Sequence, residues 1–199
     1  MLGMKNKVKV AISYLGLFIC CVGLLDNCNW SLIRGSNNAN SLPNGWRYPE
    51  DKDIYGEWKN NVGTELYVLG VIREKPYFVA GDFNGDNILD QGWILLSDDG
   101  ARWGLFVYLG RKNSKPAILK IFEVSVLIPA QYSVISLASS GPNTIKTACG
   151  RGLYECKPGE PEEIRIEYDS IYFCKPESAC QLIIWNEKRK NFDRVQIDD

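Results

Sequence analysis

Short apolar runs separated by turn residues fill most of the chain from about residue 65 to its end. They are rich in Val, Ile, Tyr and Phe and are bounded by Gly, Asn, Asp or Pro: "ELYVLGVI", "PYFVAGDF", "GWILLSD", "WGLFVYLG", "AILKIFEVSVLI", "EIRIEYDSIYF" and "CQLIIWN". Runs of this kind are typical of β-strands. In "LIIWNEKRKNFDRVQI" two runs flank a polar turn, which predicts a C-terminal hairpin. The pattern predicts a mainly β fold with a minor α component, built as a small antiparallel sheet or sandwich. A complete propeller is not expected, because no segment repeats at a fixed period.

One short helix is expected near the start of the β-rich region, in "YPEDKDIYGEWKNN". Pro49 suits a first helical turn, and the acids that follow it favour a helix N-terminus. Ile54 and Trp58 are four residues apart and therefore lie on one helical face. This segment is the clearest helix signal in the chain.

The N-terminus has the pattern of an export signal. Lys5, Lys7 and Lys9 precede the uncharged run "VAISYLGLFICCVGLL", which is shorter than the roughly 20 residues that span a bilayer. We therefore expect a signal peptide at 1–27, with a permanent anchor as the alternative.

Cys28 is the candidate first residue of the exported protein. "LDNC" places Leu25 three residues before it, and this resembles the lipobox of bacterial lipoproteins, in which the cysteine receives the lipid. Cleavage at another site is the alternative. Residues 28–42 are rich in Asn and Ser and are expected to form a tether, followed by a single β-rich domain at 43–199.

The remaining cysteines indicate the cellular compartment in which the protein folds. Cys149, Cys156, Cys174 and Cys180 are an even number in a chain with an export signal, which favours disulfides. The short separations favour Cys149 with Cys156 and Cys174 with Cys180. A zinc site is the alternative, but these spacings are wider than those of its usual cysteine pairs.

The stretch "VAGDFNGDNILDQGWILL" carries candidate metal ligands at every second residue. Asp82, Asn84, Asp86 and Asp90 offer side-chain oxygens, and Ile88 offers its backbone carbonyl. A hard cation that takes six to eight oxygen ligands suits this set, which indicates calcium. The alternative is an Asx-rich turn whose side chains accept hydrogen bonds from their own backbone and need no ion.

This stretch also resembles a known family. The residues "FVAGDFNGDNILDQGWILL" followed by "GLFVYLG", within 77–110, are similar to one unit of FG-GAP or VCBS-type repeats, the blades of integrin-like β-propellers. The resemblance implies calcium held between two strands by Asp82, Asn84, Asp86 and Asp90. The exported part as a whole resembles small bacterial exported proteins that carry such repeats and have no assigned activity.

Histidine is absent from the chain, which excludes catalysis by a histidine base or by Ser-His-Asp and Cys-His systems. Carboxylate chemistry remains, but the acids in "CKPGEPEEI", together with Glu155, lie in a Pro- and Gly-containing segment typical of an exposed loop. A pair of pocket carboxylates would be needed to cleave a glycosidic bond.

The charge and the aromatic content of the chain limit the kinds of partner that we expect. The formal net charge of −1 and the scattered basic residues give no indication of nucleic-acid binding. Aromatic residues make up 12% of the chain, and a few exposed rings would suit recognition. We expect a non-catalytic cell-envelope binding module with a structural calcium loop, in the periplasm or tethered to the membrane through its signal or lipid. Its partner would be a protein or a glycan. The alternatives are a carboxylate-based glycan-cleaving enzyme and a periplasmic immunity-type protein that neutralises a secreted toxin.

Overall fold

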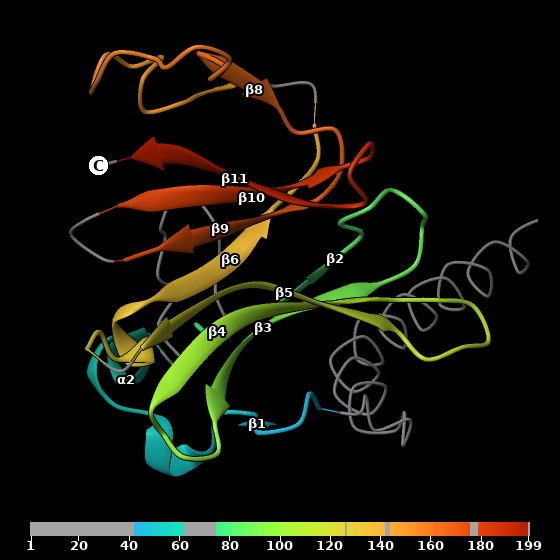
Figure 1. Ribbon diagram of the computed structural model, residues 1–199, viewed down its shortest axis with the longest axis vertical. Coiled ribbons are helices and arrows are strands. Elements are labelled where there is room, and N and C mark those ends of the chain that lie inside the picture. The colour runs from blue at the N-terminus through green and yellow to red at the C-terminus, as the bar shows by residue number, and fades with distance from the viewer. Residues whose placement is uncertain (1–41, 62–74, 126, 142–143, 176–178, 199) are drawn as a thin grey trace, which may run out of the picture. The chain divides into compact units, whose positions relative to one another are not determined.

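The computed structural model describes residues 42–61, 75–125, 127–141, 144–175 and 179–198 (Figure 1). All of them belong to Leu42–Asp199, one of two units into which the chain divides. The expected signal peptide, Cys28, most of the expected tether and the expected strand "ELYVLGVI" lie outside the described residues.

Two antiparallel sheets and a small ribbon make up the domain (Figure 1). In the first sheet the strand order is β1-β3-β4-β5, with β2 also paired to β3, and in the second it is β11-β10-β9-β6. The strands of the first sheet are β1 (Trp46–Arg47), β2 (Phe78–Gly81), β3 (Asp90–Ser97), β4 (Arg102–Leu109) and β5 (Ala117–Ser125). Those of the second are β6 (Val134–Ala138), β9 (Ser170–Cys174), β10 (Cys180–Asn186) and β11 (Asn191–Asp198), and the ribbon is β7 (Thr144–Lys146) with β8 (Glu163–Arg165).

The main hydrophobic core lies between the two sheets. It combines residues of the first sheet, such as Ile94 and Leu105, with residues of the second, such as Ile171 and Ile183, all of them fully buried. This arrangement is a β-sandwich, which confirms the expected fold class. The segment that leads into β2 is bonded to β6 of the second sheet, because the Ile135 N–H donates to the Pro76 carbonyl at 2.8 Å.

The outer face of each sheet is also covered in part. Leu95, Phe106 and Tyr108 point away from the main core and pack under the segment that contains Leu42 and Trp46. On the second sheet, Leu182 and Ile197 belong to a separate cluster that includes residues of the β7–β8 ribbon. Burial on both faces explains why "WILL" and "GLFVYL" are continuous apolar runs and do not alternate with polar residues.

The helix is shorter in the structure than the segment "YPEDKDIYGEWKNN" from which it was predicted. A 3₁₀ turn, η1 (Asp51–Asp53), precedes the helix α2 (Gly56–Asn61). Gly56, the first residue of α2, has a φ of 55°. A continuous right-handed helix does not allow this value, so η1 and α2 do not merge into one helix. Trp58 is fully buried in the core, as its position on the apolar face predicts. A second 3₁₀ turn, η2 (Ala130–Tyr132), leads into β6.

One strand prediction needs correction, and the strand β6 was missed. "EIRIEYDSIYF" is not one strand, because β8 and β9 belong to different sheets and a turn at Tyr168–Asp169 separates them. The side chain of Asp169 is bonded to the backbone of Ser140 and Asp82 there. β6 was not anticipated, since its run is short and interrupted by Ser136. Its register on β9, with Ile135 opposite Phe173, is set by tertiary pairing.

Candidate metal-binding loop and adjacent groove

The candidate metal ligands occupy the connection between two paired strands. β2 and β3 are antiparallel, with Gly81 opposite Asp90, so residues 82–89 form the loop of a hairpin. Gly85 and Asn87 both have positive φ, at 75° and 60°. Gly and Asn tolerate this left-handed conformation better than other residues, and it lets the loop turn back on itself.

Asp82 organises the backbone of the loop. One of its carboxylate oxygens accepts hydrogen bonds from the N–H groups of Gly85 and Asp86 at 2.9 and 3.1 Å. The other accepts from Asn87 at 2.8 Å. These bonds direct several successive N–H groups toward one carboxylate, which folds the chain around it.

Asn84 and Asp86 repeat the pattern one step further along. The amide oxygen of Asn84 accepts from the Asp86 N–H at 3.1 Å, and a carboxylate oxygen of Asp86 accepts from the Ile88 N–H at 2.8 Å. The Asn84 amide also donates to Asp86 at 3.1 Å. Three of the candidate ligands are therefore joined to one another or to neighbouring backbone, as in an Asx-rich turn.

Asp90 differs from the other acids because it is fully buried. Its two oxygens accept from the N–H groups of Phe83 at 2.9 Å and Gly110 at 2.7 Å. Burial raises the pKa of this carboxyl to about 6; the two backbone hydrogen bonds lower it, and the charges of Asp86 and Asp82 raise it further. Asp90 thus connects the loop to the end of β4.

A second aspartate fixes the other side of the loop. Asp169 accepts from the Asp82 N–H at 3.2 Å and from the Ser140 N–H at 3.0 Å. Next to it, the ring of Tyr168 lies so close to Gly85 that a Cβ on Gly85 would be 2.2 Å from a ring carbon. Sequence reasoning missed both residues, since they are more than 80 positions away along the chain.

The loop carries three carboxyl groups, at Asp82, Asp86 and Asp90. Among the ion pairs of the described residues, none involves Asp82, Asp86 or Asp90. A divalent cation would supply positive charge, and the donors are oxygens only, which fits calcium. Within the described residues, however, no three His, Cys, Asp or Glu side chains are grouped closely enough to hold a metal ion. In this structure the Asp82, Asn84 and Asp86 side chains accept hydrogen bonds from the loop backbone.

An open groove of about 650 Å³ lies beside the loop. Loop residues Asn84, Gly85 and Asp86 form part of its lining. The remainder comes from the β4–β5 turn region, from Tyr168 and from the β10–β11 hairpin: Leu109, Gly110, Arg111, Ala117, Leu119, Trp185, Glu187 and Lys190. The groove therefore combines two aromatic rings with charges of both signs.

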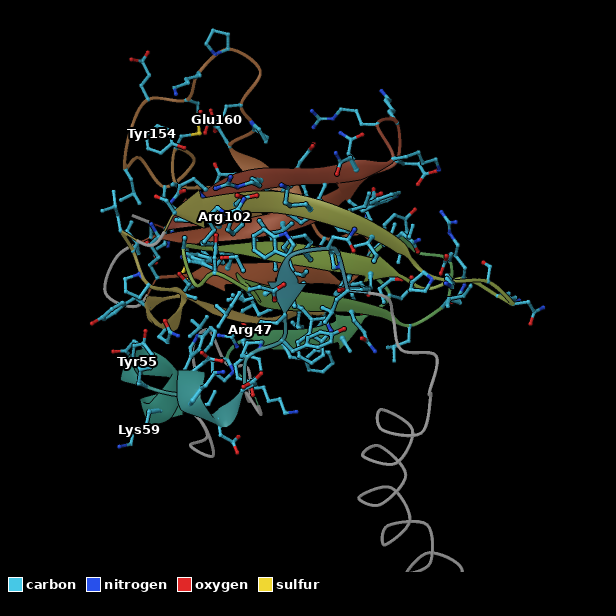
Figure 2. All side chains as sticks on the ribbon, turned by 60° about the horizontal axis from the view of Figure 1, so that its bottom comes forward. Arg47, Tyr55, Lys59, Arg102, Tyr154 and Glu160 are labelled. Atoms are coloured by element: carbon cyan, nitrogen blue, oxygen red, sulfur yellow. A yellow bond between two sulfur atoms is a disulfide. The ribbon has the colours of Figure 1, made fainter. Side chains whose placement is uncertain are left out.

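The acids of "CKPGEPEEI" lie elsewhere, in the segment between β7 and β8 and, for Glu163, at the start of β8 (Figure 2). Glu160 accepts from the Tyr154 hydroxyl at 2.5 Å and from the Lys157 N–H at 3.1 Å. Glu155, Glu162 and Glu163 are exposed. Hydrogen bonding of Glu160 to Tyr154 lowers the pKa of this carboxyl, whereas a catalytic acid requires a raised one.

Both expected disulfides are present, which confirms the pairing. Cys149 is bonded to Cys156, and Cys174 is bonded to Cys180. The second bond joins the last residue of β9 to the first residue of β10. Disulfides are typical of proteins in oxidising, extracytoplasmic environments.

In the described part of the chain, no helix has the length and apolar character needed to cross a bilayer. Comparisons of the chain with protein-family models, with curated proteins and with solved structures give no match.

Proposed function

We propose that the protein is a binding module of the cell envelope in which one structural calcium ion stabilises the 82–90 loop. The module engages a protein or a glycan through the groove beside that loop. The observation that carries this proposal is the position of the groove, because Asn84 and Asp86 are both candidate calcium ligands and lining residues. An ion that fixes the loop would fix one wall of the groove as well.

The composition of the groove supports recognition. Binding sites of 300–1,000 Å³ commonly combine aromatic side chains with a few polar groups that orient the ligand. Tyr168 and Trp185 supply the rings here, and each offers an apolar face together with a polar tip. Arg111 is exposed and forms no ion pair among the described residues, so it remains available to a partner.

The envelope location rests on the two disulfides and on the N-terminal export pattern. Lipid attachment at Cys28 is part of the proposal. Mass spectrometry of the mature N-terminus tests it: a lipid-modified Cys28 is expected, and an unmodified terminus at another residue contradicts the lipid.

A pull-down from envelope extracts tests the binding function. We expect capture of one partner in calcium, with loss of capture in chelator. Arg111→Glu should abolish capture, because it reverses a charge in the groove. Lys112→Glu is the matched control, since Lys112 is exposed and does not line the groove. Equal capture by the two variants would contradict the groove as the binding surface, and a captured secreted toxin would indicate the immunity-type role.

Glycan cleavage is a second candidate because Asp86 and Glu187 line the same groove. Lys190 and the Trp185 N–H lower the pKa of Glu187, so Glu187 suits a base or nucleophile and not the acid that this chemistry also needs. An assay on envelope glycans separates the two candidates. Turnover that Glu187→Gln abolishes would establish an enzyme, and stable binding without turnover would support the module.

A further inference from the structure

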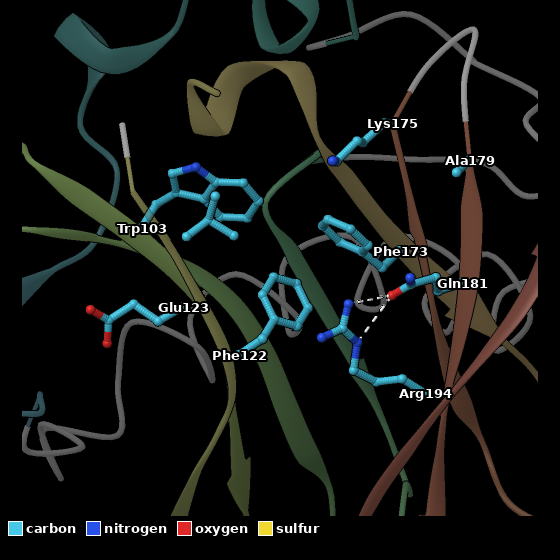
Figure 3. A pocket seen from close by; sticks show the side chains of 9 residues that line it. Trp103, Phe122, Glu123, Phe173, Lys175, Ala179, Gln181 and Arg194 are labelled. Atoms are coloured by element: carbon cyan, nitrogen blue, oxygen red, sulfur yellow. Dashed lines mark hydrogen bonds between the residues drawn. The ribbon is translucent and has the colours of Figure 1, made fainter. Parts of the chain in front are cut away.

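A second, smaller pocket of about 140 Å³ lies between the two sheets, away from the loop (Figure 3). Its lining comes from β4 and β5 of the first sheet, from β9, β10 and β11 of the second, and from Lys175 and Ala179, which directly follow β9 and precede β10. Its aromatic and polar lining includes Trp103, Phe122, Phe173, Lys175, Gln181 and Arg194. None of them lines the groove beside the loop.

Three aromatic rings form the apolar part of this pocket. Phe122 and Phe173 meet edge to face with ring centroids 4.9 Å apart, and Trp103 lies 5.9 and 6.1 Å from them. The Trp103 N–H is already bonded to the Ile128 carbonyl at 2.6 Å. The three side chains therefore present ring carbons to the pocket, and their mutual packing holds them in place.

Arg194 places a fixed positive charge next to these rings. Its guanidinium lies over the Phe122 ring, 4.6 Å from the centroid. The Gln181 amide oxygen accepts from its Nε and one Nη at 3.1 and 2.8 Å. Arginine has five N–H donors, so three remain for a ligand. A guanidinium held on two sides is preorganised, which reduces the entropy lost when it binds an anion.

The other charged groups make the pocket electropositive. Lys175 points its ammonium group into the same space (Figure 3), and no described residue forms an ion pair with it. Glu123 points away from the pocket (Figure 3), and it already pairs with Arg102 at 2.8 Å and Lys120 at 2.7 Å. The Cys174–Cys180 disulfide immediately precedes Lys175 on one strand and Gln181 on the other, and so fixes this rim.

We propose that this pocket binds a carboxylate attached to an apolar group of about the size of a benzene ring. The carboxylate would lie between Arg194 and Lys175, and the apolar group would contact the rings of Trp103, Phe122 and Phe173. The volume agrees with this size, because a 150 Å³ apolar cavity holds benzene. Charge-assisted hydrogen bonds to a carboxylate are roughly twice as strong as neutral ones. The site goes beyond the function proposed above and does not depend on calcium.

Titration of the purified protein with phenylacetate, followed by ¹H–¹⁵N NMR, tests the proposal. We expect saturable binding that shifts the signals of Phe173 and Gln181 and is unchanged in chelator. Phenylacetamide has nearly the same shape without the charge and should bind at least tenfold more weakly. Acetate carries the charge without the ring and should also bind at least tenfold more weakly.

Single substitutions test whether phenylacetate binds in this pocket. Arg194→Gln and Lys175→Gln should each weaken phenylacetate binding at least tenfold. Lys112→Gln removes one positive charge outside the pocket and should leave it unchanged. If Arg194→Gln fails to fold, the comparison of phenylacetate with its amide on the unaltered protein decides the question.

A carboxylate attached to an apolar group could belong to a peptide C-terminus or to a free small acid, and binding measurements distinguish the two. A short peptide ending in Phe with a free carboxylate should bind more tightly than phenylacetate if the natural ligand is a peptide C-terminus, and its C-terminal amide should bind weakly. Equal or weaker binding of the peptide indicates a free small acid. The proposal is overturned if phenylacetate does not saturate, if its amide binds equally well, or if Lys112→Gln weakens binding as much as Arg194→Gln. None of these results bears on capture through the groove.

Discussion

The buried carboxylate of Asp90 accepts a hydrogen bond of 2.7 Å from the backbone N–H of Gly110, twenty residues further along the chain. Gly110 follows directly after β4, so this bond links the start of β3 to the end of its neighbour. The other oxygen of Asp90 accepts from Phe83, inside the 82–90 loop. One side chain thus joins the candidate metal loop to the sheet.

Replacing Asp90 should destabilise the fold whether or not calcium binds. Asp90→Asn leaves one of the two N–H groups facing an amide donor, and an unsatisfied buried donor costs about 1–3 kcal/mol. Asp90→Ala leaves both N–H groups without an acceptor and should cost more. Urea unfolding in chelator measures the change, with the exposed Asp98→Asn as control. Equal stability of the Asn variants at these two positions would contradict the role of Asp90.

Gly85 should be less replaceable than Gly100. Both have positive φ, at 75° and 68°, where an L-residue costs roughly 1–2 kcal/mol. A Cβ at Gly100 meets open space, whereas one at Gly85 would collide with the Tyr168 ring. We expect Gly85→Ala to lower the free energy of unfolding by at least about 1 kcal/mol more than Gly100→Ala does. Inserting a methyl group into a well-packed site has a free-energy cost of this size. In a Tyr168→Ala background this difference should disappear, and its persistence there would contradict the collision.

Calcium should raise the midpoint of thermal unfolding. An ion that binds only the folded state stabilises it by about 2.7 kcal/mol when free calcium is a hundredfold above the dissociation constant. Asp82→Ala and Asp86→Ala should abolish the rise. Asp98→Ala is a better control than Asp99→Ala, because Asp99 accepts hydrogen bonds from Ser97 and Ala101 within its own turn. Identical melting in calcium and in chelator would mean that the loop is only a polar turn.

The ion pair of Arg47 and Asp53 should give the stability an acid-sensitive component. Two guanidinium nitrogens of Arg47 donate to the two carboxylate oxygens of Asp53 at 2.6 and 2.9 Å. This contact lowers the pKa of Asp53 below its usual 3.8. A lowered folded-state pKa gives stability that is present above about pH 4 and lost as the pH falls through the folded value.

Asp53→Asn should therefore lower the free energy of unfolding at pH 7 by about 1.5–3 kcal/mol, the range for hydrogen bonds to charged groups. The difference between the unaltered protein and the variant should shrink below about pH 4. Denaturant unfolding across this pH range measures it. A difference that stays constant down to pH 2 would show that the ion pair contributes no pH-dependent stability.

Local sequence features predicted much of this protein. The apolar runs gave the strands around Ile94, Leu105 and Ile183, because strand preference depends on residue type and alternation over a few positions. The two disulfides were predictable for a similar reason, since each closes a short segment. The backbone bonds of Asp82, Asn84 and Asp86 also lie within five residues of one another.

Contacts between distant segments were not predictable in this way. Asp169 is bonded to Asp82 across 87 positions, and Tyr168, just before it, lies against Gly85. Arg194, Gln181 and Phe122 converge only after the two sheets have packed. The apolar pattern of a strand predicts which of its faces is buried. Many different orders of strand pairing would bury the same faces, however. Which order forms depends on the packing of the whole sandwich. The sequence by itself therefore determined most of the strands, the turn chemistry of the loop and the disulfides. The tertiary structure decided how the strands divide between two sheets, and which side chains meet in the groove and in the smaller pocket between the sheets.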